Sequence, residues 1–257
     1  MPGLRQSLFI VLTAVIFFAT AYSVVHDTYL DTSNPLLTHL AHPLSHTHYY
    51  ANKANPLNVY FIKRTWAWAS VTFFLSWFTS PEPMRTSRRW AKWATETAIW
   101  LLFTTWFFGP SIFERVILAS GGECVLALPT GDPMIVPTEL CLARSSLSPA
   151  SHPQIFPQSL SFTLPLDWHS APRLRRGHDV SGHIFLLTMS SLFLADQLRY
   201  SLGVKNRSLA HNIALSANAI VILCCIFGTY TTSLYFHSPL EKFSGYRESF
   251  SLYLSVP

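Results

Sequence analysis

Five apolar stretches of about 20 residues dominate this sequence and constrain its fold more than any other feature. A helix that crosses a membrane needs about 20 mostly apolar residues, because the hydrocarbon core is ~30 Å thick and each residue rises 1.5 Å. The stretches predict an all-α, multi-pass transmembrane helical bundle that forms one integral membrane domain over residues 1–257. Their bounds are 7–25, 59–79, 95–118, 182–198 and 211–236.

Charge is scarce. Charged residues make up 12% of the chain and hydrophobic residues 49%, whereas soluble globular proteins carry about 25% charged residues. The net charge of +5 is small and scattered along the chain. It is therefore read as a membrane charge bias, and we expect no nucleic acid as a partner.

The first span and a possible sixth span leave alternatives open. The first stretch is interpreted as a retained span. Arg5 precedes an apolar core at 8–18 that is followed by Ala19-Thr20-Ala21, so a cleaved signal peptide stays open as the alternative. After Gly245 only twelve residues remain, which are too few to cross a membrane. The prediction is five clear spans with a possible shortened sixth.

Two interruptions of the helical pattern are expected. Gly109-Pro110 predicts a kink in the third stretch. Residues 119–177 are polar, rich in Pro and Ser, and show no helical period, so they are expected to form a long lumenal loop.

Basic residues orient the bundle. With a cytoplasmic amino terminus, the connections 80–94 and 199–210 face the cytoplasm and carry most of the basic side chains near the spans. The positive-inside rule favours this orientation. Asn206-Arg207-Ser208 fits a glycosylation pattern but lies on the cytoplasmic side, so it is predicted to be unmodified.

Two histidines are the candidate catalytic residues. Ser181 or Asp179 is expected to cap the fourth helix, and Gly182 permits a close approach of the backbone. The free amides at this positive helix end favour an anion beside His183. His237 follows the fifth helix, and consecutive antiparallel helices place it at a similar depth.

Such a pair can divide a phosphoryl transfer, because one imidazole can attack phosphorus while the other protonates the leaving oxygen. The alternative is that each histidine is a polar residue near lipid headgroups. Further basic residues are expected on the same face, against the positive-inside trend, and guanidinium and ammonium groups bind phosphate. The alternative is that these cations are solvated. The predicted substrate-binding residues are the basic Lys63, Arg64, Arg173, Arg175 and Arg176, together with Ser181 and Gly182 at the start of the fourth helix.

Other clusters carry weaker signals. His39, His42, His46 and His48 have loose metal-like spacing, but no Cys, Asp or Glu lies among them, which favours a polar loop. No metal and no cofactor are predicted. Cys124 and Cys141 share the long loop and are candidates for a disulfide in an oxidising compartment.

Several ordered blocks resemble the fat storage-inducing transmembrane (FIT) family, including its fungal members. They cover roughly residues 55–245, and the block at 179–188, Asp-Val-Ser-Gly-His-Ile-Phe-Leu-Leu-Thr, is the most specific. The others are Asn-Val-Tyr-Phe-Ile-Lys at 58–63 with Trp66 and Trp68, Thr-Ala-Ile-Trp at 97–100, and Tyr-Phe-His at 235–237 with Lys242.

The resemblance implies a multi-pass enzyme of the endoplasmic reticulum (ER) membrane whose active site resembles that of lipid phosphate phosphatases. The implied activity is an acyl-coenzyme A diphosphatase that converts fatty acyl-CoA into acyl 4′-phosphopantetheine and adenosine 3′,5′-bisphosphate without a metal. The family's catalytic histidines match His183 and His237 on the lumenal side. By analogy His237 attacks and His183 protonates; Glu241 is a candidate to orient His237, with Pro239 as an obstacle.

The resemblance also implies partners and a role. The partners are fatty acyl-CoA, neutral lipids and membrane phospholipids, with protein partners left open. The implied role is ER lipid homeostasis, phospholipid balance and lipid-droplet formation. Two alternatives stay open: a non-catalytic di- or triacylglycerol-binding protein, and a b-type haem protein that uses the two histidines as ligands.

Overall fold

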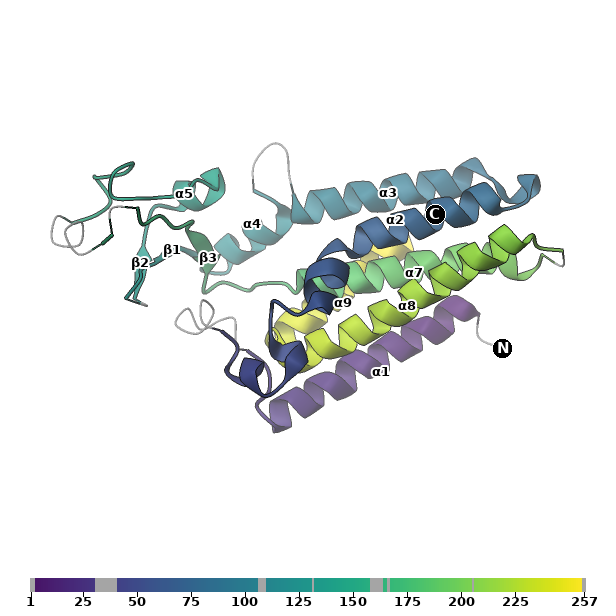
Figure 1. Cartoon of the computed structure of the whole chain (residues 1–257), viewed down its shortest axis with the longest axis horizontal. Coiled ribbons are helices and arrows are strands. Elements are labelled where there is room, and N and C mark those ends of the chain that lie inside the picture. Colours follow the sequence, from purple (N-terminus) through teal and green to yellow (C-terminus); the bar gives the residue numbers. More distant parts are fainter. Residues whose placement is uncertain are drawn as a thin grey trace. The chain divides into compact units, whose positions relative to one another are not determined.

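The computed structural model describes residues 3–30, 41–105, 110–130, 132–157, 164–165, 167–204 and 206–255. The described chain is predominantly helical and contains one small sheet (Figure 1). It divides into two compact units. The first comprises Met1–Leu30, Ala41–Leu102 and Ser181–Pro257, and the second comprises Asp31–Leu40 and Phe103–Val180.

The first unit is a helical bundle. Its long helices are α1 (Leu4–Val25), α2 (Thr65–Thr79), α3 (Ser87–Thr104), α7 (Gly182–Leu202), α8 (Leu209–Tyr235) and α9 (Pro239–Ser255). Short 3-10 or π turns precede α2 and α3, at Pro43–His46, Tyr49–Ala51, Leu57–Phe61, Ile62–Arg64 and Glu82–Met84. Helix α8 packs along α1, α2 and α7, and α7 also contacts α9.

Helix α7 forms the centre of this bundle. Every side chain from Ile184 to Gln197 is buried, and α1, α2, α8 and α9 all pack against it. This position explains why an apolar stretch contains Asp196 and Gln197. Their polar groups face neighbouring helices, where Asp196 meets Lys92 and Gln197 meets Arg89.

Two helices, Leu4–Val25 and Leu209–Tyr235, are long and apolar enough to cross a membrane. Each buries one side in the bundle and exposes large apolar side chains on the other, such as Phe18 in α1 and Leu223 in α8. An exposed apolar surface of this kind suits lipid better than water.

The second unit contains α4 (Ile112–Ala119), α5 (Thr138–Ala143) and a three-stranded antiparallel sheet. The strands β1 (Glu123–Ala127), β2 (Pro133–Ile135) and β3 (Arg173–Arg175) lie in the order β2-β1-β3. A disulfide joins Cys124 of β1 to Cys141 of α5, which confirms the predicted pairing. Leu126, Leu147 and Phe156 are central members of its apolar core.

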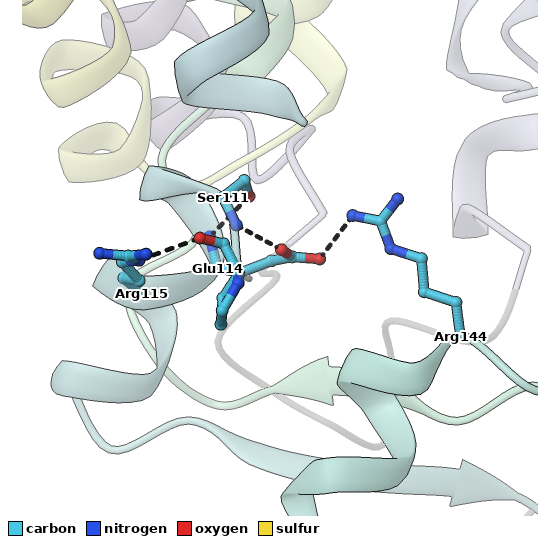
Figure 2. A network of polar contacts seen from close by, with 5 residues as sticks. Ser111, Glu114, Arg115 and Arg144 are labelled. Carbon is cyan, nitrogen blue, oxygen red and sulfur yellow. Dashed lines mark hydrogen bonds and ion pairs between the residues drawn. The ribbon is translucent and has the colours of Figure 1, made fainter. Parts of the chain in front are cut away.

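The structure differs from the expected third span at 95–118. Helix α3 begins earlier, at Ser87, and ends at Thr104, and α4 is a separate helix. Ser111 starts α4 with a capping box: its Oγ accepts from the Glu114 amide at 3.3 Å and its amide donates to the Glu114 carboxylate at 2.7 Å (Figure 2). Such a cap satisfies amides at a helix start. Gly109 of the expected kink lies outside the described residues.

Three other segments depart from expectation. The stretch 59–79 forms an α-helix only from Thr65 onward. The expected irregular loop at 119–177 contains the sheet and α5. Gly245, after which the sequence was expected to be too short for a sixth span, lies within the 17-residue helix α9 (Pro239–Ser255).

Candidate functional site

The amino terminus of α7 is held by α9. Ser181 caps α7, because its Oγ accepts from the Ile184 amide at 3.4 Å, and its own amide donates to the Glu241 carbonyl at 3.0 Å. Of the two predicted caps, Ser181 is thus the one used. Gly245 allows this contact, since a Cβ there would lie 2.5 Å from the Ser181 carbonyl oxygen. Gly182 is the first helical residue.

The last carbonyls of α8 accept hydrogen bonds from outside the helix. The last carbonyls of a helix receive no hydrogen bond from its own amides, so they need other donors. Here Lys242 Nζ donates to the Ser233 carbonyl at 2.7 Å and Thr28 Oγ1 donates to the Leu234 carbonyl at 2.9 Å. The Tyr235 carbonyl accepts from the Leu30 amide at 3.0 Å and lies 2.9 Å from His42 Nε2.

His237 occupies the turn between α8 and α9 with a positive φ of 63°. A residue other than glycine pays on the order of 1–3 kcal/mol to hold this left-handed conformation, and it does so only where its surroundings fix the chain. The capped end of α8 on one side and the start of α9 on the other supply that constraint. The backbone of His237 is therefore fixed by both helices.

Glu241 ties His237 to α9. Its Oε2 accepts from the Ser238 amide at 2.8 Å and lies 3.6 Å from Nδ1 of His237. Pro239 does not prevent this approach, because it is the first residue of α9, a position where the missing N–H costs no helical bond. Glu241 thus touches both halves of the site, since its carbonyl also accepts from Ser181.

The structure brings His183 and His237 together from 54 positions apart. Both side chains are part-buried, and the electrostatic neighbours of His183 include His237 and Lys63. Within the described part of the chain, Nδ1 of His237 has no hydrogen-bond partner. The two imidazoles and the Lys63 ammonium group are thus electrostatic neighbours.

The nominated cations fall into two sets. Lys63 and Arg64 are exposed in the turn before α2, in the same unit as the histidines. Arg173, Arg175 and Arg176 belong to the second unit, in or directly after β3. There Arg176 pairs with Glu123 at 2.7 Å, and burial, followed by the charge of Arg173, lowers the pKa of Arg175.

Two residues to which the sequence analysis gave no role in this site contact its segments. Lys242, given above only with the block at 235–237, is fully buried and donates to Ser23 Oγ at 3.0 Å as well as to Ser233. His42, expected in a polar loop, is buried and its Nδ1 accepts from the Leu44 amide at 3.0 Å. Only Lys242 had a sequence signal, its position one turn beyond His237.

The histidines around His42 differ in burial. His46 and His48 are exposed, and His39 lies outside the described residues. Among the residues that the structure describes, no group of three or more His, Cys, Asp or Glu side chains is arranged to hold a metal ion.

A helical membrane protein with a histidine pair at one end of its bundle is the class that this fold and site define. The chain belongs to the fat storage-inducing transmembrane (FIT) protein family, whose model matches residues 46–215. His183 lies inside this match and His237 lies beyond it. No solved structure matches the chain.

Curated relatives carry a common printed name. Acyl-coenzyme A diphosphatase fit1 of Schizosaccharomyces pombe is 26% identical over 209 residues, which cover 78% of this chain and 69% of that protein. Acyl-coenzyme A diphosphatase FITM2 of Homo sapiens is 26% identical over 210 residues, and that of Xenopus tropicalis is 23% identical over 207. These matches cover 77% of this chain, and 67% and 66% of the relatives.

Proposed function

We propose that this protein hydrolyses the diphosphate bond of fatty acyl-CoA, releasing acyl 4′-phosphopantetheine and adenosine 3′,5′-bisphosphate. The observation that carries the proposal is the link that Glu241 makes between the two histidine segments. Its carbonyl accepts from the amide of Ser181, two residues before His183, at 3.0 Å, and its Oε2 lies 3.6 Å from Nδ1 of His237. The names of the relatives support this choice of substrate among phosphate esters and anhydrides.

In the proposed reaction His237 is the nucleophile. The Glu241 carboxylate lies on the Nδ1 side of its ring, so Nε2 is the atom available for attack. The Nε2 lone pair forms a bond to phosphorus, the bond from phosphorus to the bridging oxygen breaks, and His183 gives its proton to that oxygen. Water then displaces the phosphoryl group from His237 and returns a proton to His183.

Glu241 has a defined part in this scheme. A carboxylate near an imidazole orients the ring and stabilises the positive charge that develops on it when Nε2 bonds to phosphorus. The burial of Glu241 at the base of α9, where only 2% of the residue is exposed, strengthens this electrostatic effect. The mechanism requires no metal ion.

Cations and helix amides would hold the substrate. We assign the diphosphate to the amino terminus of α7 at Ser181 and Gly182, with Lys63 and Arg64 beside it, because amides and ammonium or guanidinium groups neutralise phosphate. Arg173, Arg175 and Arg176, in or directly after β3 of the second unit, stay predicted as phosphate-binding cations. The acyl chain would remain in the membrane.

The proposed setting is the ER membrane, with several spans and the histidine pair facing the lumen. Besides α1 and α8, the segments of α2, α3 and α7 would cross the bilayer, and basic connections at 80–94 and 199–210 would face the cytoplasm. In this setting the enzyme would serve ER lipid homeostasis, phospholipid balance and lipid-droplet formation.

The test compares purified wild type with His183→Ala and His237→Ala, using oleoyl-CoA in the presence of EDTA. Each variant should lose at least about 10²-fold in activity, the typical contribution of a proton-transfer group. His46→Ala is the matched control, because His46 is exposed and lies outside the pair. Equal nucleotide release from all four proteins would reject catalysis and favour a non-catalytic di- or triacylglycerol-binding protein.

A further inference from the structure

We propose that His42 is a positioning residue for His237, and that it acts through the last carbonyl of α8. The inference rests on the proposed function, but its geometry does not. His42 follows α1 in the sequence and is separated from His237 by 195 positions, as the numbering shows. It has no direct contact with the proposed reaction.

Both ring nitrogens of His42 have a backbone hydrogen-bond partner. Nδ1 accepts a hydrogen bond from the Leu44 amide at 3.0 Å, so this nitrogen carries no proton. In the neutral ring the proton is then on Nε2, which lies 2.9 Å from the Tyr235 carbonyl oxygen and donates to it. One ring thus joins the turn at Pro43–His46 to the end of α8.

Ring contacts extend this hold to the residue before His237. The His42 ring meets the Tyr235 ring edge-on at 6.0 Å and the Phe236 ring edge-on at 5.9 Å between centroids. Tyr235 and Phe236 directly precede His237, whose φ is 63°. His42 therefore fixes the two residues that determine where the strained turn begins.

The electrostatic state of His42 suits this role. The residue is only 4% exposed, and burial is the main cause that lowers its pKa, with Lys53 and His48 acting in the same direction. A neutral ring keeps Nδ1 as an acceptor for Leu44, whereas an imidazolium would lose that bond. The ring thus remains in the one tautomer that serves both partners.

Two substitutions separate the two hydrogen bonds of the His42 ring. Asparagine places an acceptor where Nδ1 lies and is a good cap for Leu44, but it does not reach the Tyr235 carbonyl. Glutamine places an N–H donor where Nε2 lies and reaches Tyr235, but it gives up the cap. His42→Asn and His42→Gln therefore form a matched pair of similar size and polarity.

In steady-state assays of the full-length protein with oleoyl-CoA, His42→Asn should lose about 10- to 100-fold in kcat, the scale expected for a misplaced catalytic group. Its KM should stay within about twofold, because substrate contacts are unchanged. His42→Gln should keep most of kcat. Equal losses in both variants, a greater loss in His42→Gln, or unfolding of His42→Asn in a thermal melt would overturn the proposal.

A spectroscopic readout makes the result independent of the activity. In ¹⁵N-histidine-labelled protein, the ring signals of His237, assigned by their loss in His237→Ala, should shift in His42→Asn and stay in place in His42→Gln. If the wild type hydrolyses no acyl-CoA, the proposed function fails, yet this spectrum still tests the positioning. Unchanged His237 signals in His42→Asn would reject it.

Discussion

The two units place their charges differently. In the first unit, Lys92 and Asp196 form an ion pair at 2.6 Å whose side chains are only 9% and 10% exposed. In the second unit, the pairs Arg144–Glu114 and Arg176–Glu123 lie at 3.1 and 2.7 Å, and their arginines are 60% and 51% exposed. Figure 2 shows the Arg144–Glu114 pair at the start of α4.

The contrast follows from how each unit buries its polar groups. The helices of the first unit enclose polar side chains between them, as with Arg89, whose guanidinium donates to Gln197, Ser80 and Ser76. The second unit has a small apolar core and a disulfide. Interior polar contacts therefore specify the bundle, whereas a covalent link secures the smaller unit.

The largest expected effect is on the buried pair. Lys92→Met removes an ammonium group 2.6 Å from Asp196 inside the bundle and should lower the free energy of unfolding by about 3–5 kcal/mol. Thermal unfolding in detergent measures the change. Arg88→Met is the control, because Arg88 is exposed on the same helix. Similar melting temperatures for the two variants would show that the buried pair contributes no more than a surface charge.

The next effect is confined to the second unit. Cys124→Ser/Cys141→Ser removes a link between residues 17 positions apart, which should cost about 3 kcal/mol. Limited proteolysis should then cut within 103–180 while the helices of the first unit stay protected. Cys224→Ser is the control, since that cysteine is free. New cleavage within α7 or α8 would contradict the expectation that the disulfide stabilises the second unit alone.

Sequence alone located the helices whose pattern is unbroken. The expected stretches at 7–25 and 211–236 match α1 and α8 within a few residues, because long apolar runs have few alternatives. The split between α3 and α4 was missed, since hydropathy does not register a capping box such as that of Ser111 and Glu114. Helix α9 was missed because its polar residues serve contacts with α7 and α8 that no local pattern reveals.

The candidate site was predicted to a similar degree. The histidine pair follows from the antiparallel order of two neighbouring helices, and the helix cap at Ser181 follows from its side chain. The roles of Thr28 and His42 depend on the end of α1 and the turn after it meeting the end of α8, about 200 positions later. Such long-range hydrogen bonds have no signature in one sequence.

A smaller effect is expected where α9 meets α7. Gly245→Ala would bring a Cβ to 2.5 Å from the Ser181 carbonyl oxygen, so the helices must separate, at a cost of about 1–3 kcal/mol. Gly203→Ala is the matched control, because its Cβ would meet nothing within 4 Å. The melting temperature and the rate of oleoyl-CoA hydrolysis should both fall in Gly245→Ala and stay unchanged in Gly203→Ala. Unchanged values for Gly245→Ala would refute this close approach of α9.

The smallest effect is expected from the exposed pair of the second unit. Arg176→Ala removes the guanidinium that pairs with Glu123, yet the cost should be no more than about 1 kcal/mol, because water and salt screen exposed charges. Arg176 also has a φ of 70°, so Arg176→Gly, which relieves that conformation, serves as a second variant. If Arg176→Ala lowers the free energy of unfolding as far as Lys92→Met does, the exposed and buried pairs contribute equally to stability. A small loss in Arg176→Ala that Arg176→Gly reduces would instead assign the local cost to the backbone.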